Sequence, residues 1–436
     1  MDTVLITALD QEGRGIARID GKAVFVEGAL AGELVTIETY RKRPTYELAR
    51  ATGILRASPS RVAPLCPHFG VCGGCSLQHL EAAAQVAAKQ RVLEDALWHI
   101  GRVRAGELLT PIHGPAWGYR QRARLSVRDV PKKGGVLVGF HERKSSFITD
   151  MRSCPVLPPH ISSLLPSLRE LIGSLSLRDR LPQIELAIGD DADDGTGNEV
   201  LVLRNLAALT ADDERALADF ADRHGVRLYL QPQGPATVQA FHPPARTLGY
   251  ALADFGVRIE FQPTDFTQVN VAMNRMLVRR AVGLLEPAEG DAVADFFCGL
   301  GNFSLPMARR GAQVVGVEGS VPLVRRAQAN AQANGLADRA RFVAADLFEA
   351  TAASLEALGA MDKALLDPPR EGAIALVKAL PAEQLSRVVY VSCNPGTLAR
   401  DASVLVHERG FALRKAGIVN LFPHTAHVES VALFTR

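Results

Sequence analysis

The sequence predicts an α/β protein of several domains: a small N-terminal β-barrel, a central α+β part and a C-terminal doubly wound sheet. Three observations support this prediction. Five short strand-like segments separated by polar turns fill residues 2–57, and residues 160–260 mix helical and strand patterns. From about residue 266, apolar strands alternate with helical stretches, which is typical of a parallel sheet. We therefore expect domains at residues 1–58, 59–265 and 266–436.

Composition indicates an ordinary soluble protein. The 436 residues are 47% hydrophobic and 22% charged. The first residues lack the basic start and apolar core of a signal peptide, and no apolar run is long enough to span a bilayer. We expect a cytoplasmic protein with no membrane contact and no obligate protein partner, and a monomer as the default.

Charge is unevenly distributed along the chain. Residues 1–160 carry 22 Lys and Arg against 15 Asp and Glu, whereas the remainder carries 27 against 32. A basic front half indicates that a polyanion binds there, although chance clustering on a solvated surface gives the same pattern.

The N-terminal segments are typical of a small barrel of the oligonucleotide-binding type, because five short strands with glycine turns fit in fewer than 60 residues. Basic residues gather at the end of this region: Arg41, Lys42, Arg43, Arg50, Arg56 and Arg61. The alternative is a generic barrel with an exposed basic loop.

The C-terminal region contains a strand, glycine turn and helix in "ADFFCGLGNFSLPMARRG". Gly299 and Gly301 allow a ligand to approach the backbone closely, and Glu318 ends the next strand, where a carboxylate can bind a ribose. The third and fourth strands end at Asp346 and Asp367, so all these residues should meet at one edge of the sheet. This series resembles the class I S-adenosylmethionine-dependent methyltransferases, although another nucleotide-binding α/β domain fits the bare pattern.

Four cysteines have the pattern of a metal site. Cys66, Cys72 and Cys75 lie in one loop rich in Gly and Pro, and Cys154 lies far along the chain. Zinc and an iron–sulfur cluster both fit these ligands. The spacing differs from the Cys-x3-Cys-x2-Cys run of radical enzymes, which argues against radical chemistry.

Cys393 stands apart, in a strand that runs into the turn "SCNPG". A free thiol has a pKa of about 8.5, so a nucleophile needs help from its surroundings. A thiolate and a methyl donor suit uracil, because addition to C6 makes C5 nucleophilic. Glu429 in the terminal strand is the candidate base that then removes the C5 proton. His424 and His427 are also nearby, but we interpret them as structural.

The long motifs "DFFCGLGNFSLP", "VVGVEG", "LLDPPREG", "VSCNPGTLARD" and "FPHTAHVES" are similar to those of the RNA uracil-C5-methyltransferases. Residues 2–57 also resemble a TRAM domain, an RNA-binding barrel. The four loop cysteines match the 4Fe-4S ligands of the branch that modifies 23S ribosomal RNA.

The resemblance implies a role for each candidate residue. Cys393 is the nucleophile and Glu429 the base, and a 4Fe-4S cluster of structural rather than redox function is held by Cys66, Cys72, Cys75 and Cys154. The target is a uridine of 23S ribosomal RNA, flipped out of a loop. Phe297 is expected to pack on S-adenosyl-L-methionine, Glu318 to hold its ribose and Asp346 its adenine. The full set of expected donor contacts is Gln268, Phe297, Asn302, Glu318, Asp346 and Asp367.

Cys298 has no assigned role. Tyr119, Arg120, Arg122 and Arg124 alternate along a predicted strand whose face could follow phosphates, or could simply be a soluble edge. Two rival functions remain. One is an amino-group methyltransferase, because "DPPR" resembles the motif of that class, although Arg370 stands where that motif has an aromatic residue. The other is a non-catalytic RNA-binding or ribosome-assembly factor. Neither has a use for Cys393 together with Glu429.

Overall fold

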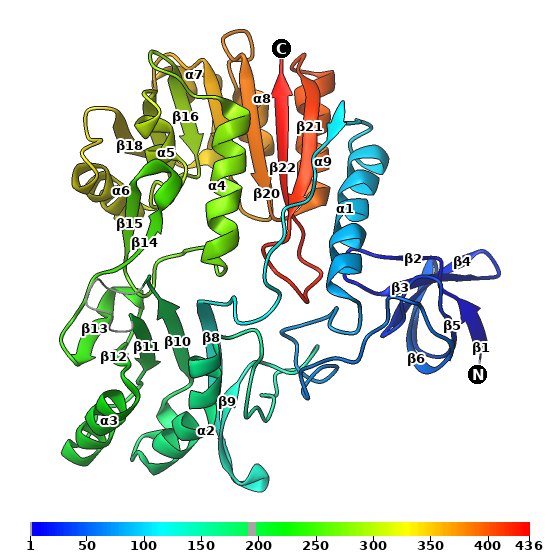
Figure 1. Cartoon of the computed structure of the whole chain (residues 1–436), viewed down its shortest axis with the longest axis vertical. Helices are drawn as coiled ribbons and strands as arrows, with labels where there is room; N and C mark the ends of the chain where they lie inside the picture. The colour runs from blue at the N-terminus through cyan, green and yellow to red at the C-terminus, as the bar shows by residue number, and fades with distance from the viewer. Residues whose placement is uncertain (1, 191–197) are drawn as a thin grey trace.

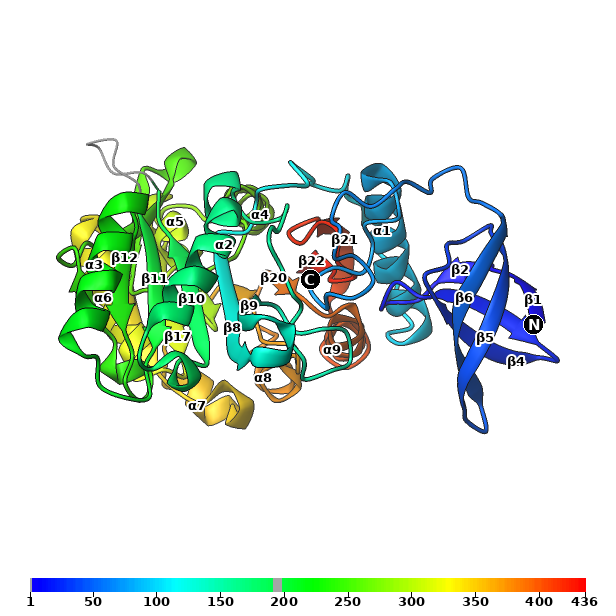
Figure 2. The same ribbon diagram turned by 90° about the horizontal axis from the view of Figure 1, so that it is seen from below.

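The N-terminal part is a six-stranded sheet that lies to one side of the molecule (Figures 1 and 2). This computed structural model describes residues 2–190 and 198–436. The strand order is β1-β5-β6-β4-β3-β2, and the sheet encloses its own core, which includes Ile6, Val24 and Val35. The strands are β1 (Asp2–Leu5), β2 (Ala8–Leu9), β3 (Gly15–Ile19), β4 (Lys22–Glu27), β5 (Leu34–Lys42) and β6 (Tyr46–Arg56).

The prediction of a strand-rich N-terminal domain is confirmed, with six strands in place of five. The first expected strand is divided into β1 and β2 at Ile6 and Thr7. Ile6 N donates to Glu33 O and Thr7 N donates to Ile16 O, so the chain changes partner at this point. A hydrophobic pattern reports which residues face inward, and it does not report such a change of hydrogen-bond partner.

The central part is a second six-stranded sheet, with the order β13-β12-β11-β10-β8-β9. Helix α2 buries a stripe at helical spacing that includes Ile161, Leu165 and Leu168, and α3 begins with a capping box between Thr210 and Asp213. Both helices share one core with the sheet. The elements are β8 (Arg122–Val130), β9 (Gly135–Gly139), α2 (Pro159–Ser174), β10 (Gln183–Ile188), β11 (Glu199–Arg204), α3 (Ala211–His224), β12 (Arg227–Leu230) and β13 (Gln239–His242).

The C-terminal sheet has the order β18-β17-β16-β19-β20-β22-β21-β7. Its strands are β16 (Ala292–Phe296), β17 (Gln313–Glu318), β18 (Ala340–Ala344), β19 (Lys363–Leu366), β20 (Arg387–Ser392), β21 (Ala412–Val419), β22 (Glu429–Thr435) and β7 (Glu107–Leu108). Neighbours from β18 to β20 are parallel, whereas β22 is antiparallel to β20 and β21. The predicted doubly wound sheet with a terminal hairpin is therefore confirmed. The chain runs from β16 through β17 to β18 on one side of the sheet, and then from β19 to β20 on the other side. A ligand crevice is expected between β16 and β19, where the strand order reverses.

Helices cover both faces of the C-terminal sheet, with one hydrophobic core on each side. These helices are α4 (Val271–Leu285), α5 (Ser304–Arg309), α6 (Val321–Ala333), α7 (Ala352–Glu356), α8 (Ile374–Ala379) and α9 (Pro395–His407). The ribbon of β14 (Leu248–Leu252) and β15 (Val257–Phe261) packs on α5 and α6. None of the helices in residues 2–190 and 198–436 is both long and apolar enough to cross a membrane.

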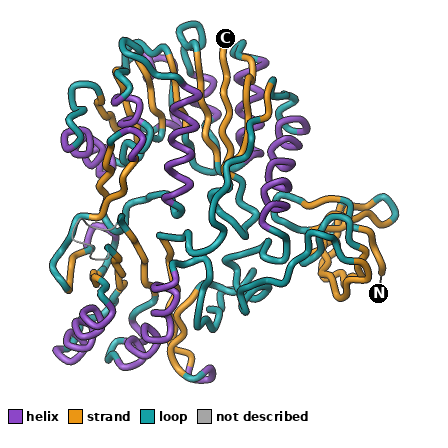
Figure 3. Tube along the Cα trace, in the orientation of Figure 1, coloured by secondary structure: helices purple, strands orange, loops and turns teal. Residues whose placement is uncertain are grey.

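One helix from the front half of the chain packs on the C-terminal sheet. Helix α1 (Ala82–His99) lies against α9 and β21, and Leu93 and Leu97 share a core with Leu398. β7 then pairs with β21. These elements lie inside the range predicted for the central domain, and the domain boundaries themselves stay predictions. Loops from all three parts meet in the middle of the molecule (Figure 3).

Candidate active site

A cavity of ≈ 1190 Å³ lies at the carboxyl ends of the C-terminal strands. It is lined by all eight residues that the sequence suggested for the nucleophile, the base and the donor contacts: Gln268, Phe297, Asn302, Glu318, Asp346, Asp367, Cys393 and Glu429. The other two parts of the chain also contribute to its wall, through Gln11 and Glu12 of the N-terminal sheet and through Gly73, Gly74, Ser76 and Arg120. One cavity therefore joins the predicted donor residues to the predicted nucleophile.

The glycine turn after β16 has an unusual backbone. Phe297 has a φ of 65°, and Gly299 follows with a φ of 54°. The amides of Phe297 and Cys298 both donate to Val317 O, at 2.9 and 3.1 Å, which holds the turn against β17. A positive φ in a bulky residue is costly and is found mainly where function requires it. A Cβ on Gly299 would meet open space, so this backbone is accessible to a ligand.

Two acidic residues shape the same end of the cavity. Glu318 accepts from the amides of Gly299 (3.2 Å) and Ser320 (3.0 Å), so its carboxylate is fixed at the end of β17. Asp346 accepts from Phe348 N at 2.9 Å, and the rings of Phe348 and Phe297 lie 5.8 Å apart. Aromatic rings beside fixed carboxylates provide the stacking and hydrogen-bonding groups that a nucleoside needs.

Asn302 is held by residues that the sequence did not single out. Its Oδ1 accepts from the hydroxyl of Tyr250 and from Nδ2 of Asn274, each at 2.9 Å, and its Nδ2 donates to Asn274 Oδ1 at 3.0 Å. Tyr250 lies on β14 and Asn274 on α4, and no local motif relates them to the glycine turn. Gln268 also lines the cavity, as does Phe266 two residues before it, which is 72% exposed.

Cys393 follows the last residue of β20, and the next turn is held by hydrogen bonds. Asn394 N donates to Ser392 Oγ at 3.1 Å, and Ser392 Oγ donates to Asn394 O at 3.0 Å. Asn394 also caps α9 by accepting from Gly396 N at 3.0 Å, and Pro395 occupies the first helical position. The strand end, the turn and the cap together hold Cys393 at the cavity wall.

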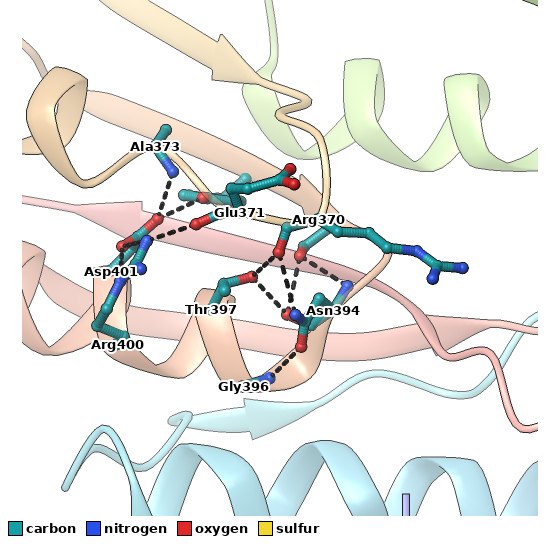
Figure 4. A network of polar contacts seen from close by, with 10 residues as sticks. Arg370, Glu371, Ala373, Asn394, Gly396, Thr397, Arg400 and Asp401 are labelled. Carbon is teal, nitrogen blue, oxygen red and sulfur yellow. Dashed lines mark hydrogen bonds and ion pairs between the residues drawn. The ribbon is translucent and has the colours of Figure 1, made fainter. Parts of the chain in front are cut away.

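A second network fixes the loop of Arg370 against the start of α9 (Figure 4). Arg370 O accepts from Asn394 Nδ2 (3.0 Å) and from Thr397 Oγ1 (3.2 Å). The buried Asp401 accepts from Ala373 N at 2.8 Å and from the hydroxyl of Tyr390 at 2.6 Å. Hydrogen bonds therefore join the loop after Asp367 to the turn after Cys393.

Acidic groups and burial determine the protonation state around Cys393. Burial and the negative charges of Glu429 and Asp367 raise the pKa of Cys393 to about 11, against the opposing positive charge of Arg370. Burial and Asp367 also raise the pKa of Glu429 well above its ordinary value, and burial raises the pKa of Asp367 to about 7. At neutral pH, Cys393 is therefore a thiol in the protein alone, and its activation requires a change in the surrounding charge.

The four loop cysteines lie in one region of the central part. Cys66, Cys72 and Cys154 are buried, Cys75 is half-buried, and none of the four forms a disulfide. Burial, together with the charges of neighbouring cysteines, raises the pKa of Cys75 to about 11 and that of Cys154 to about 12. Within residues 2–190 and 198–436, no three His, Cys, Asp or Glu side chains converge tightly enough to bind a single metal ion.

The arginine-rich segment at 119–124 does not form one exposed face. Tyr119 is buried and its hydroxyl donates to Pro423 O at 2.9 Å. Arg122 donates to Pro263 O at 2.9 Å, and Arg124 pairs with Glu185. Strand β8 begins only at Arg122, so the alternation expected over the whole segment is absent, and Arg120 alone of these four lines the cavity.

Comparisons with known proteins agree with this geometry. The model of the tRNA (uracil-5-)-methyltransferase family matches residues 250–436, and the TRAM domain model matches residues 3–51. The chain is 64% identical to a protein of Aromatoleum aromaticum and 62% identical to one of Azoarcus, each over 100% of both chains. Both relatives are named 23S rRNA (uracil(1939)-C(5))-methyltransferase RlmD.

A solved structure shows the same fold. The tRNA (uracil-54, C5)-methyltransferase of Pyrococcus abyssi, in complex with S-adenosyl-L-homocysteine, superposes with a TM-score of 0.73 at 23% identity and covers 100% of both chains. At this identity the likeness concerns the fold, whereas the full-length relatives above establish the family. The chain belongs to the family of RNA uracil-C5-methyltransferases.

Proposed function

We propose that this protein transfers a methyl group from S-adenosyl-L-methionine to C5 of a uridine in 23S ribosomal RNA. The observation that carries the proposal is the single cavity that Cys393 and Glu429 share with the residues suited to the donor. The names of the relatives that match the full chain support ribosomal RNA as the substrate, and the TRAM match supports RNA binding. The site of action is then the cytoplasm, where ribosomal RNA is found.

The donor end of the cavity has the groups that this ligand requires. Phe297 and Phe348 offer ring faces to an adenine, Glu318 accepts from a ribose diol, and Asp346 accepts from the adenine amine. Gln268, Asn302 and Asp367 complete the contacts. S-adenosyl-L-methionine supplies a methyl group on a positively charged sulfur. Cys393 and Glu429 ionise more readily when such a charge enters their cavity, because it offsets the repulsion from Asp367.

Cys393 then acts as the nucleophile. Its thiolate forms a bond to C6 of uracil, and the C5–C6 π electrons move toward the O4 carbonyl. C5 takes the methyl group, and the electron pair of the broken carbon–sulfur bond stays on the donor sulfur. Ionised Glu429 removes the C5 proton, the C5–C6 double bond forms again, and the Cys393 thiolate leaves. The uridine must leave its stack to reach Cys393, so it enters the cavity as a flipped nucleotide.

The position of the methyl group in cellular RNA tests this function. Ribosomal RNA from a strain that lacks the gene is expected to lose 5-methyluridine from 23S RNA, and the wild-type gene should restore it. Nucleoside mass spectrometry with position mapping measures the change. Unchanged 5-methyluridine in 23S RNA, or the loss of an N-methylated base instead, contradicts the proposal.

We also propose that Cys66, Cys72, Cys75 and Cys154 hold a 4Fe-4S cluster with a structural role. In such a cluster each iron binds its own thiolate, so the four sulfurs surround the cluster and need not converge on one point. The charges of other cysteines of this set contribute to the raised pKa values of Cys75 and Cys154, which supports a shared site. Methyl transfer consumes no electrons, which favours a structural role.

Iron analysis tests the cluster. Protein purified without oxygen is expected to be brown and to contain about four irons per chain. A Cys154→Ser variant should lose the colour and most of the iron. Stoichiometric zinc in place of iron would overturn the assignment.

A further inference from the structure

The loop that leads into Glu429 is held from behind by helix α1. We call residues 420–428 the base loop, because they connect β21 to β22, which begins at Glu429. Its residues Phe422, Thr425, Ala426, His427 and Val428 line the cavity. A loop with side chains in the cavity and the proposed base at its end must keep one conformation for proton removal to be efficient.

Gln85 of α1 fixes the middle of the base loop. His424 N donates to Gln85 Oε1 at 2.8 Å, and His424 Nδ1 lies 3.2 Å from Gln85 Nε2. His424 has a φ of 65°, and Trp117 stacks on its ring at 3.7 Å. Gln85 is only 1% exposed. The buried contacts of Gln85 and Trp117 with His424 indicate that the surrounding structure maintains the strained backbone of His424.

Lys89, one turn further along α1, fixes the start of the base loop. Its Nζ donates to Asn420 Oδ1 at 2.7 Å and to Phe422 O at 2.8 Å. Lys89 is 2% exposed, and burial lowers its pKa to about 7. Both acceptors are neutral, so this side chain is not placed for an ion pair. A buried lysine is costly and is retained where its hydrogen bonds are needed.

The same contacts reach the cysteine segment. Gln85 Nε2 also donates to Leu77 O (3.1 Å) and Leu80 O (2.8 Å), while the amides of Ser76 and Leu77 both donate to His424 O at 2.9 Å. Ser76 directly follows Cys75. The base loop is therefore packed between α1 and the segment that carries three of the four cysteines.

We infer that Gln85 and Lys89 are positioning residues for Glu429, and that Gln85 also joins the cysteine segment to the base loop. This inference rests on the proposed function, because it assigns them to the step in which Glu429 removes the C5 proton. Without them the base loop moves, Glu429 is displaced, and release of the RNA becomes slow. Methyl transfer to C5 precedes this step, so the covalent Cys393–RNA intermediate accumulates.

The test uses the full-length variants Lys89→Met and Gln85→Leu with a 23S RNA fragment. We expect turnover to fall roughly 10- to 100-fold, because a displacement of about 1 Å has effects of this size. The RNA-linked fraction of the protein on a denaturing gel should rise, and S-adenosyl-L-homocysteine affinity by calorimetry should stay unchanged. Arg91→Met is the matched control, because Arg91 is exposed on the same helix and pairs with Asp95. If Lys89→Met does not fold, Lys89→Gln keeps a donor at this position.

The outcomes distinguish a failure of the positioning role from a failure of the proposed methyl transfer. Slow turnover without accumulated adduct, or an equal loss of S-adenosyl-L-homocysteine affinity, overturns the positioning role while wild-type methylation stands. Unchanged turnover in both variants overturns it as well. Wild-type protein that transfers no methyl group overturns the proposed function and the inference together.

Discussion

Replacement of Cys393 by alanine is expected to abolish methyl transfer while S-adenosyl-L-homocysteine binding persists. Uracil C5 becomes nucleophilic only after a thiolate has added to C6, so no other residue of the cavity substitutes for this sulfur. The loss should exceed about 10⁴-fold, as for other covalent nucleophiles. Transfer of a labelled methyl group to 23S RNA measures the activity, and calorimetry measures binding.

The chain offers a matched control for this substitution. Cys298 belongs to the glycine turn and is buried, and its sulfur lies 2.9 Å from the position that a Cβ on Gly316 would occupy. Cys298→Ala is expected to retain methyl transfer, because the proposed chemistry does not use this thiol. A Cys393→Ala variant that still methylates RNA at the wild-type rate contradicts the covalent mechanism.

The rate of methyl transfer by the wild-type protein is also expected to rise with pH. Because the pKa of Cys393 is raised, the thiolate fraction grows about tenfold for each pH unit below the pKa. The pKa of Glu429 is also raised, so the ionised form that can accept the proton becomes more abundant as the pH rises. The rate of methyl transfer is therefore expected to rise from pH 6 to pH 8.

Replacement of Glu429 by glutamine is expected to trap the protein on its RNA. The amide has the shape of the carboxylate and cannot accept the C5 proton, so the C5–C6 double bond does not form again and Cys393 remains attached. Glu429 is 3% exposed, which leaves little access for a water molecule to replace it. A denaturing gel with labelled RNA should show a slow-migrating protein–RNA species that depends on the methyl donor.

The double variant Cys393→Ala with Glu429→Gln provides the control. It retains the cavity and the glutamine and lacks the sulfur, so the slow-migrating species should disappear. Glu429→Gln protein that turns over normally without adduct would exclude Glu429 as the base. Persistence of the adduct in the double variant would mean that another residue bonds to the RNA.

Much of the cavity was predictable because it lies at strand ends. Glu318 ends β17, and Asp346, Asp367 and Cys393 lie within two residues of the ends of β18, β19 and β20. Parallel strands bring these carboxyl ends to one edge of the sheet. Glu429 was predictable for the same reason, since it begins the strand that pairs with β20.

The contacts that hold these residues in place were not predictable. Tyr250 and Asn274 reach Asn302 across 52 and 28 positions, and Lys89 reaches Asn420 across 331. No periodic pattern records such partners, because they depend on how separate elements pack. The packing of α1 on α9 has the same origin, because the sequence of α1 predicts a helix and does not identify the surface that covers Leu93 and Leu97. The expected arginine face failed because Tyr119 and Arg122 have buried partners far along the chain.

The most direct test of the central claim is peptide mass spectrometry of the adduct formed by Glu429→Gln protein with 23S RNA and S-adenosyl-L-methionine. The covalent mechanism predicts that the peptide containing Cys393 carries a single uridine already methylated at C5, bonded through sulfur to C6. A modified peptide without the methyl group, a nucleotide attached at another residue, or a methyl group on an exocyclic amine would contradict it.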